Sequence, residues 1–64
     1  MASQGPDERK LLYRLQGELG LEGSFARELL TSEWELICAD IPFNEDVALS
    51  HLAMAAIERL WSAP

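Results

Sequence analysis

Residues 44–61 of this 64-residue chain are NEDVALSHLAMAAIERLW, and this stretch decides the fold. Asn44 is a favourable helix N-cap, and the acidic Glu45 and Asp46 follow in the first turn, where the helix dipole favours negative charge. The apolar residues beyond them recur at helical spacing, which predicts a helix from about Glu45 to Trp61. No run of alternating β-branched residues occurs in the chain, so the fold class expected is all-α.

This helix carries more apolar surface than one core needs. One stripe consists of Leu49, Leu52, Ala53, Ala56 and Leu60. A second stripe beside it consists of Val47, Met54, Ile57 and Trp61. One interpretation is the central helix of a compact monomeric bundle. We favour the other, in which the second stripe is a self-association surface and the chain is a homodimer or part of a tight complex. In either case Trp61 is expected to pack on a neighbour, either the first helix or another chain.

Upstream of this helix, residues 25–41 allow two interpretations. Apolar residues at steps of three and four fit one continuous helix; they are Ala26, Leu30, Trp34, Ile37 and Ile41. Against that, Ser32 and Glu35 match a capping box, and Thr31 beside Ser32 competes with the helical backbone for hydrogen bonds. We favour a break into two short helices at this point. Pro42 ends whichever helix precedes it.

The first helix is expected from about Pro6 to Leu19, because proline suits the first helical position and Gly20 is a plausible left-handed cap. Ser24 is the expected N-cap of the next helix. The prediction is a compact bundle of three or four short helices that dimerises through the last helix. Its domain organisation is a disordered tail at 1–5, one helical domain at 6–62 and a short tail at 63–64.

The small size of the chain raises the question of what stabilises it. A core of this length seldom supplies more than about 3–5 kcal/mol without a disulfide, a metal or a partner. Cys38 is the single cysteine and His51 the single histidine, so neither an internal disulfide nor a structural zinc site is expected. Fully burying one large apolar side chain contributes about 1.5–3 kcal/mol, so association could supply the missing stability.

The charge of the chain is unevenly distributed. Eleven acidic and five basic residues give a net charge of −6, which makes nucleic acid and anionic membranes poor partners. The surplus lies between residues 28 and 58, where seven acids occur without a lysine or arginine. These acids either form a solvated face or, as a more specific hypothesis, a surface that binds a basic partner. Its members would be Glu33, Glu35, Asp40, Glu45 and Asp46.

The sequence does not favour an enzyme. Cys38 lies between apolar neighbours, and His51 is the single candidate base, so no set of nucleophile, base and orienting group is evident. No cofactor and no metal site are expected. The absence of a signal-like N-terminal stretch and the unpaired cysteine favour the cytoplasm.

Two functional hypotheses follow from these features. The leading one is a small acidic helical protein-interaction module with a regulatory role, which self-associates through its C-terminal helix. The alternative is an immunity or antitoxin-like inhibitor whose acidic face blocks a basic partner enzyme.

Overall fold

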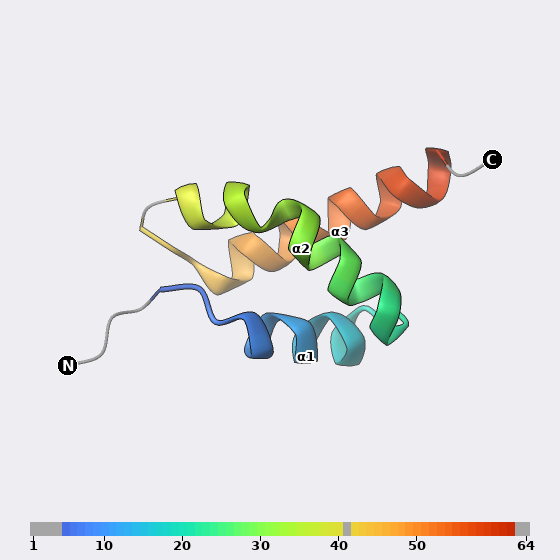
Figure 1. Ribbon diagram of the computed structural model, residues 1–64, viewed down its shortest axis with the longest axis horizontal. Coiled ribbons are helices and arrows are strands. Elements are labelled where there is room, and N and C mark those ends of the chain that lie inside the picture. Colours follow the sequence, from blue (N-terminus) through green and yellow to red (C-terminus); the bar gives the residue numbers. More distant parts are fainter. Residues whose placement is uncertain (1–4, 41, 63–64) are drawn as a thin grey trace.

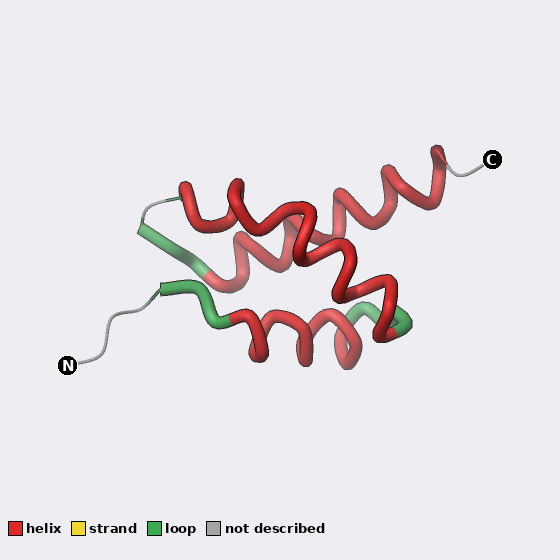
Figure 2. Tube along the Cα trace, in the orientation of Figure 1, coloured by secondary structure: helices red, strands yellow, loops and turns green. Residues whose placement is uncertain are grey.

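A computed structural model of the protein describes residues 5–40 and 42–62. Across these residues the chain folds into three helices, α1 (Glu8–Glu18), α2 (Gly23–Ala39) and α3 (Glu45–Ser62), joined by short loops (Figures 1 and 2). The all-α prediction is therefore confirmed for this part of the chain. The tails expected at 1–4 and 63–64, and the apolar position Ile41, lie outside the described residues.

Each of the three helices packs against the other two. The buried core draws on all of them and consists of Leu11, Leu15, Ala26, Leu29, Leu30, Ile37, Ala48, Leu49, Leu52, Ala55 and Ala56. Phe25, Trp34 and Phe43 are partly buried at its edge. Because α1 and α2 cover one side of α3 between them, the opposite side of α3 is left exposed by the residues that the structure describes.

The first helix begins later than the sequence predicts. Asp7 adopts an extended backbone conformation, and its Oδ1 accepts hydrogen bonds from the backbone N–H groups of Arg9 (3.1 Å) and Lys10 (3.3 Å). Asp7 is thus the N-cap, and Pro6 precedes the helix instead of opening it. At the other end, Gly20 has a φ of 68°, which confirms the left-handed position expected there.

The second helix is continuous, and the predicted break at Thr31 and Ser32 is wrong. The Ser32 hydroxyl does not cap a new helix; it donates to Glu33 Oε2 (3.3 Å) and accepts a hydrogen bond from the Arg59 guanidinium on α3. Buried Leu30 and Ile37 lie on either side of this point, and a break would remove one of them from the core. Tertiary packing therefore overrides the local capping signal.

The start of α2 also differs from the expectation. Ser24 lies inside the helix, and the N-cap position is Glu22, whose side chain makes no capping hydrogen bond. The prediction for the start of α3 is confirmed: Asn44 Oδ1 accepts a hydrogen bond from the Val47 N–H at 3.1 Å. The helix continues to Ser62, close to the expected end.

The inner stripe of α3 is shorter than predicted. Leu49, Leu52 and Ala56 are buried, but Leu60 is 65% exposed, which contradicts its expected place in the core. No residue from 57 to 62 is buried, and the last turns of α3 extend past the other two helices (Figure 1). The bundle is simply too short to cover the whole length of the helix.

The core assignment can be tested with two leucines on α2. Leu29 is fully buried and Leu36 is 61% exposed. Leu29→Ala should lower the free energy of unfolding by about 2–5 kcal/mol, because it leaves a cavity among the three helices. Leu36→Ala should change it by no more than about 0.5 kcal/mol. Urea unfolding followed by circular dichroism measures both values; equal effects would contradict the assigned core.

Candidate interaction surfaces

The outward side of α3 displays the second apolar stripe that the sequence indicates. Val47 and Ile57 are each 51% exposed, Met54 is 63% exposed and Trp61 is 85% exposed. All four predicted self-association residues therefore lie on the surface of a single chain. Trp61 does not pack on α1, so the first of its two expected environments is wrong. Whether a second chain covers this face stays a prediction.

A shallow apolar groove continues this surface toward the loop between α1 and α2. It has a volume of about 220 Å³ and is lined by Leu19, Leu21, Ala53, Ala56, Ile57 and Leu60. Ile57 and Leu60 thus belong both to the groove and to the exposed side of α3. Apolar side chains gathered in this way are typical of surfaces that bind another protein.

A second groove lies between the C-terminal end of α2 and the first half of α3. Its volume is about 380 Å³, and its lining mixes apolar residues such as Leu36 and Val47 with the polar Asp40 and His51. Asp40 and His51 are the titratable residues of this lining, and they do not form an ion pair with each other. Its lining residues therefore form no arrangement with an evident chemistry.

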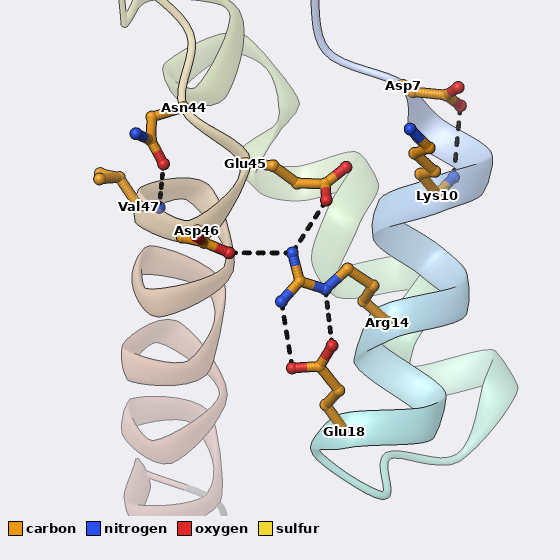
Figure 3. A network of polar contacts seen from close by, with 8 residues as sticks. All are labelled: Asp7, Lys10, Arg14, Glu18, Asn44, Glu45, Asp46 and Val47. Atoms are coloured by element: carbon orange, nitrogen blue, oxygen red, sulfur yellow. Dashed lines mark hydrogen bonds and ion pairs between the residues drawn. The ribbon is translucent and has the colours of Figure 1, made fainter.

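Two of the five predicted acidic-face residues are engaged by Arg14 of α1 (Figure 3). The Arg14 Nη1 atom lies 2.8 Å from Glu45 Oε1 and 3.1 Å from Asp46 Oδ1, both at the start of α3. The same guanidinium also pairs with Glu18, at 2.7 Å from Nε to Oε2 and 3.2 Å from Nη2 to Oε1. These four residues, called the Arg14 cluster below, join α1 to α3.

The Arg14 cluster shifts the ionisation of its members. Hydrogen bonding to Glu18, Asp46 and Glu45 raises the pKa of Arg14, so the guanidinium stays charged throughout. Hydrogen bonding to Arg14 lowers the pKa of Glu18 below its ordinary value of 4.5. One guanidinium against three carboxylates leaves two net negative charges at this end of the molecule.

Glu33 faces α3 as well. Its Oε1 lies 2.8 Å from His51 Nε2, and its side chain is only 18% exposed. The neighbouring contact of Ser32 with Arg59 joins the same two helices further along. His51 and Glu33 therefore form a bridge between α2 and α3, and it is an ion pair whenever the imidazole is protonated.

The structure thus separates the five acids that the sequence groups into one face. Glu35 and Asp40 are exposed, whereas Glu33, Glu45 and Asp46 contact basic side chains of the same chain. Arg14 is the residue that sequence reasoning missed. The sequence shows that Arg14 precedes Glu18 by four positions, which fits a helical ion pair. Its contacts with Glu45 and Asp46, however, span sequence separations of 31 and 32 residues, and no local pattern reveals such contacts.

The remaining chemistry-bearing residues form no further site in the described part of the chain. Cys38 is a free, exposed cysteine on α2. Across residues 5–40 and 42–62, no three His, Cys, Asp or Glu side chains come together in a way that could hold a metal ion. None of the helices described here has the length and apolar character required to span a bilayer.

Comparison of the chain with models of known protein families, with curated proteins and with solved structures finds no match. The functional conclusion therefore rests on the surfaces of this chain alone.

The Arg14 cluster should contribute to stability in a salt-dependent manner. Arg14→Met removes a cation shared by three carboxylates, whereas Arg9→Met removes the same charge from an exposed position without such partners among the described residues. We expect a clear loss of melting temperature for Arg14→Met and little change for Arg9→Met at low ionic strength. The difference should narrow in high salt, because screening weakens exposed pairs. Equal melting temperatures at low salt would contradict the assigned role.

The stability that the Arg14 cluster contributes depends on pH through the ionisation of Glu18. Since its folded-state pKa is lowered, the stability it contributes is present above the unfolded-state value near 4.5 and is lost as pH falls through the folded-state pKa. Glu18→Gln should therefore be less stable than the parent protein at pH 7, and the gap should close in acid. In an Arg14→Met background the gap should be small at every pH, because the partner is missing. Thermal melts from pH 3 to pH 7 measure both series.

Proposed function

We propose that this protein is a small helical protein-interaction module that self-associates through the outward side of α3. The observation that carries the proposal is the exposure of Val47, Met54, Ile57 and Trp61 on one helix whose opposite side forms the core. A regulatory role in the cytoplasm is the setting we propose for it. No reactive constellation among the described residues competes with this interpretation.

The two sides of α3 differ in the size of the side chains that they carry. The inner side relies mainly on two leucines and three alanines for its buried contacts. The outer side exposes a tryptophan, a methionine and two β-branched residues, and burying each large side chain would contribute about 1.5–3 kcal/mol before the cost of association. Met and Trp are also residue types enriched at protein interfaces. The outer side is therefore better suited to binding than to permanent contact with water.

An inhibitor with an acidic face is the second functional class that the sequence allows. Of its five proposed contact residues, Glu35 and Asp40 are exposed without an ion pair among the described residues. The other three are paired with Arg14 and His51, so part of their charge is balanced within the chain before any partner binds. This internal pairing weakens the case for electrostatic recognition and favours the apolar side of α3 as the main interaction surface.

The proposal is tested by the dependence of mass on concentration. Sedimentation equilibrium between about 1 μM and about 1 mM covers dissociation free energies from about 8 to about 4 kcal/mol. We expect a reversible monomer–dimer equilibrium in this range. Met54→Glu places a charge in the middle of the outward side of α3 and should raise the dissociation constant by about tenfold or more.

The matched control is Tyr13→Glu on α1. Tyr13 is 78% exposed and lies on a different helix, so this variant adds the same charge to an exposed apolar position away from the proposed surface. Its dissociation constant should match that of the parent protein. A parent protein that stays monomeric over the whole range would refute self-association, and equal weakening by both variants would refute the assignment to α3.

A further inference from the structure

The outward side of α3 carries a row of exposed residues that runs along the length of the helix. Val47, Ser50, Met54, Ile57 and Trp61 follow one another at steps of three, four, three and four residues. This is the spacing of the a and d positions at which two helices meet in a coiled coil. All five residues are exposed, and we call this row the α3 seam.

We propose that the α3 seam pairs with the seam of a second copy in antiparallel orientation, with Trp61 of each copy lying over Ser50 of the other. This inference rests on the proposed self-association and specifies its orientation and register. Met54 of each copy then packs beside Ile57 of the other in the two central layers. Ser50 becomes the residue that makes room for the indole ring.

The sizes of the seam residues favour this orientation. The smallest side chain, Ser50, and the largest, Trp61, occupy opposite halves of the seam. In a parallel, in-register pair every residue would meet its own copy, so two indoles would crowd one layer and two serines would underfill another. Both overpacked and underfilled layers are destabilising. The antiparallel pair instead matches large with small in the two layers formed by Ser50 and Trp61, and Val47 lies beyond these layers.

The charge distribution favours the same orientation. The Arg14 cluster leaves two net negative charges at the start of α3, and its member Asp46, which is highly exposed, flanks the α3 seam. A parallel pair would bring two such clusters to the same end. The antiparallel pair separates the two Asp46 residues by roughly 30 Å along the helices, given a rise of 1.5 Å per residue, which exceeds the Debye length of about 8 Å at physiological salt.

A second copy fits the α3 seam because the row itself carries no charged side chain. Two chains of net charge −6 can therefore meet along it without burying a charged side chain in the row, and Glu58, near the twofold axis, lies at its flank. Two heptads are too short for an isolated coiled coil, but α3 is already folded against α1 and α2. Pairing therefore does not have to supply the free energy of helix formation for the buried half of α3.

Distances between spin labels test the orientation. In a Cys38→Ser background, single cysteines are introduced as Glu58→Cys, near the expected twofold axis, and as Asp46→Cys, far from it. For the antiparallel pair we expect a short distance between the Glu58 labels and a distance of roughly 30 Å between the Asp46 labels. A third label at Ser62→Cys should give roughly 20 Å and leaves the Arg14 cluster untouched.

The outcomes separate this inference from the proposed function. Short distances at all three positions, together with a dimeric mass, would overturn the antiparallel orientation and leave self-association intact. A monomeric mass with no measurable dipolar coupling would overturn both. A gradient of distances from Glu58 through Ser62 to Asp46 supports the antiparallel register and is incompatible with the parallel one.

Discussion

The packing of one side of α3 into the angle between α1 and α2 is the constraint on which the rest of this molecule depends. Leu52 is fully buried there, together with Leu15 and Leu29 from the other helices. Once that side of α3 is packed between α1 and α2, the direction of every other α3 side chain follows from the helical repeat. The same docking brings Glu45 and Asp46 to Arg14, and His51 to Glu33.

Sequence reasoning succeeded where the deciding interactions are local. The start of α3 was predictable from Asn44 and the acids after it, and Gly20 marked the end of α1, because caps act within a few residues. The prediction was wrong at Thr31 and Ser32, because the burial of Leu30 and Ile37 on a continuous helix outweighs the local capping signal. It also failed at Leu60, because helical periodicity does not reveal how far the neighbouring helices extend.

Of the two candidate surfaces, only the one set by local helical spacing was predictable from the sequence. The four residues of the outer stripe were identifiable from spacing alone, and all of them are exposed. The acidic group was not predictable as a surface, because the positions of its counterions depend on tertiary contacts. Arg14 and His51 lie far along the chain from the acids they meet, so a count of charges overstates how much negative surface is available to a partner.

The last turns of α3 extend past the bundle, and their stability differs from that of the core. From residue 57 onward the helix has no buried side chain of its own, so its terminal turns have little tertiary support in a single chain. Their backbone hydrogen bonds can open without unfolding the core. In the dimer that we propose, the second chain covers Ile57 and Trp61, so amide exchange in these last turns is expected to slow as protein concentration rises, while exchange around Leu52 follows global unfolding. The ordering of this segment would then be part of the binding free energy of the proposed dimer, and it would make the contact weaker and more readily reversed than its apolar area alone implies.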